Sequence, residues 1–196
     1  MKIETIFANW IAYENLSLDN KSIEEFCYRK RIEDPVGRVM SNKGGWQSNN
    51  LYEKGDELKE LINIINDRII NLAKNFDYSN INDLQMCNYW ININKSIGDY
   101  NEKHNHPKAT MVAVYYVRVP YNSGEIILHN PLQDYDEFIF GNMIEKYNAY
   151  NSSIYKFIPK EGDLIIFPAW IYHNVLCNQT EEERISIAFN SNYRRK

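Results

Sequence analysis

The alternating pattern of residues 184–190 restricts the fold of this chain more than any other stretch. Successive side chains of a strand point to opposite faces, so a strand here has one apolar and one largely polar face. One face carries Ile185, Ile187 and Phe189, and the other carries Arg184, Ser186, Ala188 and Asn190. The apolar face is typical of a strand that packs on a core. Because a guanidinium inside a protein costs free energy unless it meets an anion, the pattern predicts an anion-binding pocket.

A histidine lies upstream of this strand, where it can reach the same pocket. A short apolar strand is expected from Leu164 to Phe167, followed by a turn at Pro168 and then by His173. Arg184 follows His173 by eleven positions. The whole stretch therefore predicts a pocket with a histidine at its mouth and a fixed cation within it.

Strand-like patterns continue through the second half of the chain. Alternating or β-branched runs predict further strands over residues 83–94, 110–119, 125–129 and 155–158. Gly98–Asp99 predicts a turn, and Asn122–Ser123–Gly124 predicts a hairpin turn that joins the strands on either side of it. Residues 131–153 are polar and irregular, which is typical of an inserted loop or lid. Short strands joined by turns indicate a mainly β fold, as an antiparallel barrel or sandwich.

The N-terminal part has a different character. Residues 3–13 are expected to form an edge strand, and residues 18–30 a helix. The most regular helical spacing covers residues 56–74, with Asp56 as the expected N-cap. Two adjacent glycines at 44 and 45 predict a tight turn that seats the indole of Trp46 in the core.

Length and composition fit one globular domain of 196 residues, with residues 1–80 as an extension packed on a core of residues 81–196. The net charge of −4 argues against nucleic acid as a partner. No apolar run has the length of a membrane span, and the first residues lack the pattern of a signal peptide. The three cysteines have neither metal-binding spacing nor the even number of a disulfide framework. A cytoplasmic location is expected.

The four histidines divide into a candidate metal cluster and an outlier. His104 and His106 are two positions apart, so both rings lie on one face of an extended segment and can bind one ion. Closure of a barrel can bring His173 to them from a distant strand. Imidazole ligands suit Fe, Zn, Cu and Ni. His129 has no such neighbour and is not expected to bind metal.

The order of these motifs resembles the Fe(II)/2-oxoglutarate-dependent oxygenases. Within them, four segments are similar to the 2OG-Fe(II) oxygenase family common in marine bacteria and tailed phages: SNKGGWQS at 41–48, HNHP at 104–107, VYYV at 114–117 and FPAWIYHNV at 167–175. The resemblance covers most of the chain. It implies a double-stranded β-helix, also called a jelly-roll or cupin-like barrel. It also implies Fe(II) as cofactor, with 2-oxoglutarate and O₂ as co-substrates.

The resemblance also assigns roles to residues. His173 matches the distal iron ligand and His104 the first ligand. Arg184 and Ser186 match the pair that binds the far carboxylate of 2-oxoglutarate, which agrees with the pocket expected from the strand pattern. His106 departs from the family, since most members have a carboxylate there. We favour His104, His106 and His173 as the ligands, with Asp99 or Glu102 as the alternative source of a carboxylate.

Further residues are expected around this centre. Tyr115 and Tyr116 lie on opposite faces of their strand, so one of them points into the barrel; Tyr116 and Asn92 are assigned to 2-oxoglutarate. The expected pocket for the prime substrate is formed by Tyr115, Asn94, Trp170 and Asn190.

The expected activity is hydroxylation of an unidentified prime substrate, with release of succinate and CO₂. The alternative is a three-histidine jelly roll that acts without 2-oxoglutarate, or a non-catalytic binding or assembly module. A peptide or protein is the substrate that the resemblance suggests, and a small molecule is the other option. Phage origin, with a location in the host cytoplasm, and a homodimer through the N-terminal helices are further expectations.

Overall fold

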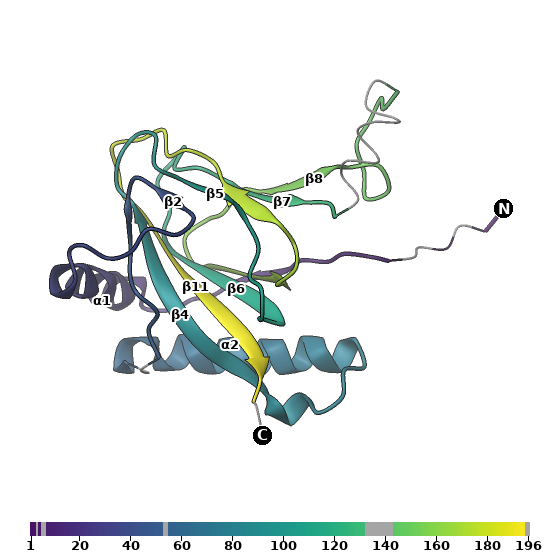
Figure 1. The fold of residues 1–196 in the computed structure, drawn as a ribbon, viewed down its shortest axis with the longest axis horizontal. Helices are drawn as coiled ribbons and strands as arrows, with labels where there is room; N and C mark the ends of the chain where they lie inside the picture. The colour runs from purple at the N-terminus through teal and green to yellow at the C-terminus, as the bar shows by residue number, and fades with distance from the viewer. Residues whose placement is uncertain (3, 5–6, 53–54, 132–142, 195–196) are drawn as a thin grey trace.

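Two antiparallel sheets face each other, and two helices cover the outer side of the larger sheet (Figure 1). The computed structural model describes residues 1–2, 4, 7–52, 55–131 and 143–194. Within these ranges, residues 1–80, which the sequence predicts to be an N-terminal extension, contribute helices and strands, and the rest of the chain contributes mainly strands.

The strands have the following bounds. The larger sheet contains β1 (Ala12–Asn15), β3 (Trp46–Gln47), β4 (Leu84–Asn94), β6 (Met111–Arg118), β9 (Asp163–Pro168) and β11 (Arg184–Tyr193). The smaller sheet contains β2 (Asn42–Lys43), β5 (Tyr100–His104), β7 (Ile126–His129), β8 (Ile154–Phe157) and β10 (His173–Val175). A single 3₁₀ turn, Ile81–Asp83, leads into β4. Of the six strands expected after residue 80, five are confirmed to within one residue at each end, and the sixth, β11, extends three residues beyond the expected end at Asn190.

The strand order is β1-β9-β6-β11-β4-β3 in the larger sheet and β2-β5-β10-β7-β8 in the smaller one. Neighbouring strands in each sheet run antiparallel. The predicted class, mainly β with a jelly-roll arrangement and N-terminal helices, is confirmed. The described strands form two opposed sheets rather than a closed barrel.

Helices α1 (Asn20–Glu33) and α2 (Asp56–Asn75) confirm the two predicted helices. The cap prediction for α2 is wrong. Gly55 occupies the N-cap without a side-chain hydrogen bond, and Asp56 lies in the first turn, where its charge favours the positive end of the helix. Helix α1 has a side-chain cap, because the carboxylate of Asp19 accepts the backbone N–H of Ser22 at 3.2 Å.

The alternation in β11 separates two cores. Ile185, Ile187 and Phe189 pack with α1 and α2 on the outer side of the larger sheet. Ala188 faces the space between the sheets, where it belongs to a second apolar cluster with Trp90 and Tyr116. The polar residues of β11 therefore face the interior between the sheets, as the pattern predicts.

Two local predictions are corrected. The turn Asn122–Gly124 does not form a hairpin: β6 pairs with β9 and β11 in one sheet, whereas β7 pairs with β10 and β8 in the other. The chain therefore crosses between sheets at this turn. The N-terminal edge strand begins only at Ala12, where β1 pairs with β9, and not at residue 3. Residues 3, 5 and 6 lie outside the described part of the chain.

The turn before Trp46 is confirmed as a tight backbone passage. Gly44 and Gly45 both have positive φ angles, +66° and +59°. A Cβ on Gly44 would lie 2.0 Å from a carboxylate oxygen of Asp99, so only glycine fits there. The indole N–H of buried Trp46 donates to the carbonyl of Asp34 at 2.9 Å. This turn fixes the segment that borders the site described below.

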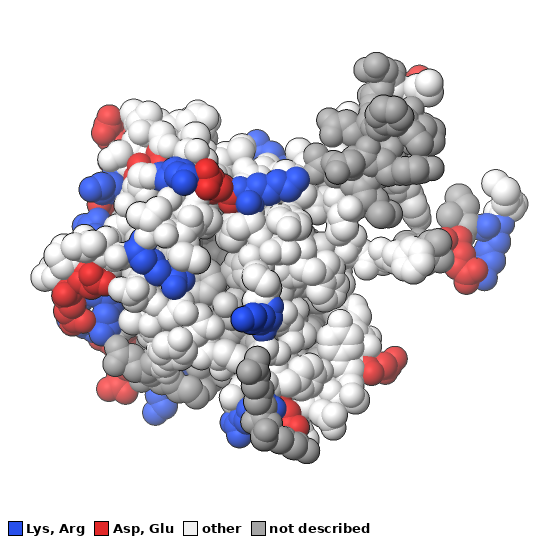
Figure 2. All heavy atoms as spheres, viewed as in Figure 1, with Lys and Arg blue, Asp and Glu red and all other residues white. Residues whose placement is uncertain are grey.

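On the face shown in Figure 2, acidic and basic side chains are interspersed, without a broad patch of one sign. Of the helices in the described ranges, none combines the length and the hydropathy required to cross a bilayer. The predicted lid covers residues 131–153, and residues 132–142 of it lie outside the described part of the chain.

Candidate metal centre

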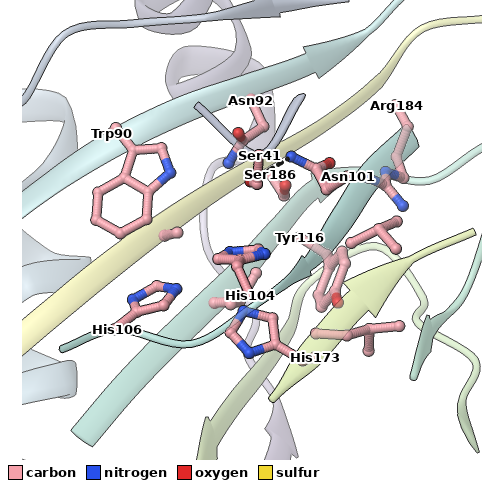
Figure 3. Close-up of a pocket in the computed structure, with 14 residues that line it drawn as sticks. Ser41, Trp90, Asn92, Asn101, His104, His106, Tyr116, His173, Arg184 and Ser186 are labelled. Atoms are coloured by element: carbon pink, nitrogen blue, oxygen red, sulfur yellow. Dashed lines mark hydrogen bonds between the residues drawn. The ribbon is translucent and has the colours of Figure 1, made fainter. Parts of the chain in front are cut away.

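Three histidines converge between the sheets (Figure 3). His104 ends β5, His106 follows in the next loop, and His173 begins β10. The antiparallel register of β5 and β10 places His104 directly opposite His173. One ring nitrogen from each histidine lies within 4.8 Å of the other two. Among the described residues, this is the one group of three or more metal-binding side chains with such spacing.

Hydrogen bonds orient all three rings in the same way. The Nδ1 atoms of His104 and His173 lie 2.6 Å and 3.1 Å from the backbone carbonyls of Glu102 and Ile171. Nδ1 of His106 lies 2.7 Å from the side-chain oxygen of Asn190. Because each partner is an acceptor, each Nδ1 carries the proton, and each Nε2 keeps a lone pair that can bind a metal ion.

The electrostatic environment keeps these rings neutral. Burial lowers the pKa of His104. Burial, together with the neighbouring His104, lowers the pKa of His106 to about 4, although the hydrogen bond between His106 and Asn190 opposes this shift. The pKa of His173 lies well below its usual value, first because of burial and then because of repulsion by His104 and His106. Neutral imidazoles near pH 7 are the form that binds metal.

The carboxylates considered as alternative ligands are engaged elsewhere. Oδ2 of Asp99 accepts the backbone N–H groups of Lys95 and Ser96 at 2.8 Å and 3.0 Å. The carboxylate of Glu102 pairs with Lys43 at 3.2 Å. Neither belongs to the histidine cluster. The alternative in which one of them supplies a ligand finds no support in these contacts.

The histidines form one side of a pocket of about 440 Å³, measured with its open mouth. Polar and apolar side chains share the wall: Ser41, Trp90, Asn92, Asn101, His104, His106, Val114, Tyr116, Ile126, His173, Val175, Arg184, Ser186 and Ala188.

Arg184 places a buried cation in this wall. Only 2% of the residue is exposed. Nη1 donates to the carbonyl of Gly124 at 3.1 Å and Nη2 donates to Oδ1 of Asn94 at 2.9 Å, whereas Nε has no partner. Within the described ranges, no carboxylate forms an ion pair with it. Burial lowers its pKa, and the nearby Tyr116 opposes this shift. The pocket thus contains a fixed positive charge without a counter-ion among the described residues.

Three strands place polar side chains in a row near Arg184. Ser186 on β11 lies beside Asn92 on β4 and beside Tyr116 on β6. The ring of Tyr116 is buried, and burial raises its pKa, so the hydroxyl stays protonated and can donate. Oδ1 of Asn92 is buried without a partner. All three sequence-predicted residues therefore line the pocket that holds Arg184 and the histidines.

The residues predicted to bind the prime substrate lie elsewhere. Tyr115 faces the helices, where its hydroxyl donates to the side chain of Asn20 and burial raises its pKa to about 12. Asn94 accepts from Arg184 and Asn190 accepts from His106, so both hold other side chains rather than line the pocket. Trp170 is 52% exposed and outside the pocket wall. None of the four is part of the pocket wall described above, and their assignment to the prime substrate stays a prediction.

Sequence reasoning missed Trp90, Ser41 and Asn101 in the pocket wall. Trp90 is two residues before Asn92 on β4, so strand periodicity could have found it. Ser41 and Asn101 come from the adjacent strands β2 and β5 or their ends, and Nδ2 of Asn101 donates to Oγ of Ser41 at 3.2 Å. Their proximity depends on a strand pairing that no local pattern reveals.

Asn190 is expected to set the orientation of His106. Its Nδ2 donates to Oδ1 of Asn88 at 3.4 Å, which directs Oδ1 toward the imidazole. In Asn190→Leu, the acceptor is lost, and Mn(II) affinity measured by calorimetry should fall about 10- to 100-fold. Asn190→Asp keeps an acceptor at this position and should retain most of the affinity. Equal affinity of wild type and Asn190→Leu would contradict this role.

A family model described as "Putative 2OG-Fe(II) oxygenase" matches residues 88–190, which is more than half of the chain. This range includes the three histidines, Asn92, Tyr116, Arg184 and Ser186. A comparison with curated protein sequences gives no match.

Solved structures with the same fold include several oxygenases. A prolyl-4-hydroxylase from Pseudomonas putida has 12% identity and a TM-score of 0.66, with 94% of this chain and 93% of that chain covered. HygX from Streptomyces hygroscopicus, solved with nickel and 2-oxoglutarate, has 10% identity, a TM-score of 0.60 and coverages of 94% and 83%. A prolyl hydroxylase from Trichoplax adhaerens, in complex with a hypoxia inducible factor peptide fragment, has 14% identity, a TM-score of 0.60 and coverages of 92% and 82%. At these identities the likeness establishes the fold.

Proposed function

The chain belongs to the 2OG-Fe(II) oxygenase family, and from this premise we propose that His104, His106 and His173 hold its Fe(II) and that Arg184 binds 2-oxoglutarate. The protein is a dioxygenase that uses Fe(II), 2-oxoglutarate and O₂. One observation carries the assignment of residues: a buried cation, without a counter-ion in the described part of the chain, shares a pocket with three converging, neutral imidazoles.

The residues present fit both groups. Three Nε2 lone pairs form a nitrogen donor set that suits Fe(II). Arg184 has an unpartnered Nε, and a carboxylate can accept from it. Tyr116 and Ser186 add hydroxyl donors in the same row of the sheet. A five-carbon dicarboxylate with a 2-oxo group therefore meets a cation at one end of the pocket and a metal site at the other.

Bound Fe(II) supplies the redox chemistry that couples O₂ and 2-oxoglutarate to succinate, CO₂ and a hydroxylated product. The chain's own contribution is placement. Arg184 and Tyr116 fix one end of the dicarboxylate, and the three imidazoles keep their Nδ1 protons on fixed acceptors. Val114, Ile126 and Val175 make part of the wall apolar, which limits water around the reacting atoms.

The ligand set carries no negative charge of its own. A carboxylate in place of His106 would cancel one unit of the metal's positive charge. With three neutral histidines, other groups must balance both units. The dianionic co-substrate can balance this charge, with Arg184 at its far end. We therefore propose that metal and 2-oxoglutarate bind cooperatively here, each raising the affinity for the other.

The prime substrate is proposed to be a peptide or a small molecule that is hydroxylated at a C–H bond. The peptide complex of the Trichoplax enzyme supports the first class by analogy of fold. A metal enzyme of this fold that acts without 2-oxoglutarate is the competing function, and the experiment below separates the two.

Anaerobic titration of the protein with Fe(II) and then with 2-oxoglutarate tests the proposal. Chelation of the oxo acid at the metal should produce a visible charge-transfer band that requires both additions. Succinate release after addition of O₂ then measures turnover. Iron binding without such a band, and without succinate, would favour the function that does not use 2-oxoglutarate.

A further inference from the structure

A second arginine, without an acidic partner among the described residues, packs on Trp90 of the pocket wall, and we infer that this residue, Arg38, binds an anionic group, a carboxylate or a phosphate, of the prime substrate. This inference rests on the proposed function and extends it to the chemical class of the substrate. It concerns a side chain that is separate from the proposed metal and 2-oxoglutarate sites.

Arg38 differs from the surface arginines of the protein. Four described arginines form ion pairs with glutamates: Arg29 with Glu57, Arg31 with Glu183, Arg68 with Glu14, and Arg118 with Glu24. Arg194 donates to Gln85. Arg38 has no side-chain hydrogen bond or ion pair with any described residue, and its Nε is buried without a partner. Of the other described arginines, only Arg184 also has a buried Nε without a partner.

The nearest acid in its own segment is already engaged. Oδ1 of Asp34 accepts the backbone N–H of Gly37 at 3.0 Å, and Oδ2 accepts from the side chain of Asn49 at 2.9 Å. Partial burial lowers the pKa of Arg38, and Tyr52 opposes this shift. A guanidinium remains charged in such a setting, and among the described residues it has a cation–π contact with Trp90 but no anionic partner.

The position of Arg38 connects it to the pocket. Its guanidinium carbon lies 5.9 Å from the ring centre of Trp90, and this ring lies 5.3 Å from the ring of His106. Trp90 and Ser41 both line the pocket. Figure 3 shows Trp90 and Arg184 on opposite sides of the histidines. An anion at Arg38 would therefore lie on the His106 side, away from the end of the pocket assigned to 2-oxoglutarate.

The backbone holds Arg38 in place before any ligand binds. Its N–H donates to the carbonyl of Gln47 at 2.9 Å. Gly37 has a φ of +59°, and a Cβ there would lie 2.3 Å from the carbonyl oxygen of Gln47. The close approach of these two backbone segments therefore requires glycine. A side chain on such a fixed backbone loses less freedom on binding than one on a loose loop.

Exposed apolar residues flank Arg38 in the sequence. Val36, Val39 and Met40 are 87%, 75% and 62% exposed. Exposed apolar side chains next to a pocket mark a surface that a ligand can cover. The combination favours a substrate whose anionic group adjoins an apolar part.

The test uses protein loaded with Mn(II) and saturated with 2-oxoglutarate, so that Arg184 is occupied. Calorimetry compares phenyl phosphate, phenylacetate and the neutral 2-phenylethanol. At least one anion should bind about tenfold or more tightly than the alcohol, and Arg38→Gln should reduce that anion's affinity by about 10- to 100-fold, the value of one charge-assisted contact. The preferred anion distinguishes a phosphate from a carboxylate substrate. Arg194→Gln is the matched control and should change nothing.

The result can separate this inference from the proposed function. Mn(II) and 2-oxoglutarate affinities are measured in the same proteins, and Arg38→Gln should leave both unchanged. If wild type fails to bind Mn(II) or 2-oxoglutarate, the proposed function is wrong, and the anion titration on metal-free protein still decides the role of Arg38. Equal anion binding by wild type and Arg38→Gln, or no anion binding by wild type, would overturn the inference.

Discussion

Replacing Arg184 with methionine is expected to weaken 2-oxoglutarate binding by about 30-fold or more, while metal binding in the absence of 2-oxoglutarate stays nearly unchanged. The guanidinium is the one buried charge in the described wall of the pocket, and its Nε has no partner. Removing one partner of a buried, hydrogen-bonded charge pair costs about 2–5 kcal/mol. Methionine keeps much of the length of the side chain, so the loss reflects charge and hydrogen bonding rather than an open cavity.

Arg184→Lys separates charge from geometry. Lysine keeps the positive charge but presents a single ammonium in place of a planar fork, so an intermediate loss of about tenfold is expected. The anaerobic charge-transfer band, followed against 2-oxoglutarate concentration, gives the affinity of each variant. Arg118→Met serves as control, because Arg118 is half-buried, lies outside the pocket wall and is paired with Glu24. A band in Arg184→Met that saturates at the wild-type concentration would remove Arg184 from the binding site.

The fold followed from sequence wherever one face of an element is uniformly apolar. In β11, the apolar residues Ile185, Ile187 and Phe189 have to lie on a core-facing row. Because side chains of a strand alternate between faces, Arg184 and Ser186 then face the space between the sheets. Helix α2 was equally clear, since its buried residues recur at helical spacing. Such patterns report burial directly, because a slip of one residue would expose the whole apolar set.

Local patterns could not report which strands pair. The turn at Asn122–Gly124 has the residues of a hairpin, and its positive φ angles at Asn122 and Gly124 are real. These residues specify a reversal of the backbone, but the sheet that receives the next strand depends on long-range packing. The contacts of Ser41 with Asn101 were hidden for the same reason.

The two tyrosines of β6 show a related limit. Tyr115 and Tyr116 are chemically identical, so alternation requires one to face the pocket without identifying which. The register between β6 and β11 also shifts between Ile185 and Ser186, which breaks any count of positions from Arg184. Asn190 was assigned to the correct face, but its role as the acceptor for His106 depends on the loop that carries this histidine.

Replacing any one of the three clustered histidines with alanine is expected to weaken Fe(II) and Mn(II) binding by more than about 100-fold. Loss of an outer partner of a ligand already costs about 10- to 100-fold, so loss of the ligand should cost more. His129→Ala is the matched control. His129 is the fourth histidine of the chain; its Nε2 contacts Asn174 at 2.7 Å, and it lies outside the cluster. Metal content after dialysis and calorimetric titration provide the measurement.

The experiment is most informative at His106, where it decides the identity of the third metal ligand, because a carboxylate is the usual ligand there in similar oxygenases. If the imidazole itself binds the metal, His106→Ala should lose metal and His106→Asp should retain it, with one unit less charge at the site. Asp99→Asn should retain metal in full, because Asp99 serves the backbone N–H groups of Lys95 and Ser96. The opposite pattern, with metal kept in His106→Ala and lost in Asp99→Asn, would transfer the third ligand to the carboxylate. The balance of charge proposed for 2-oxoglutarate would then have to be revised with it.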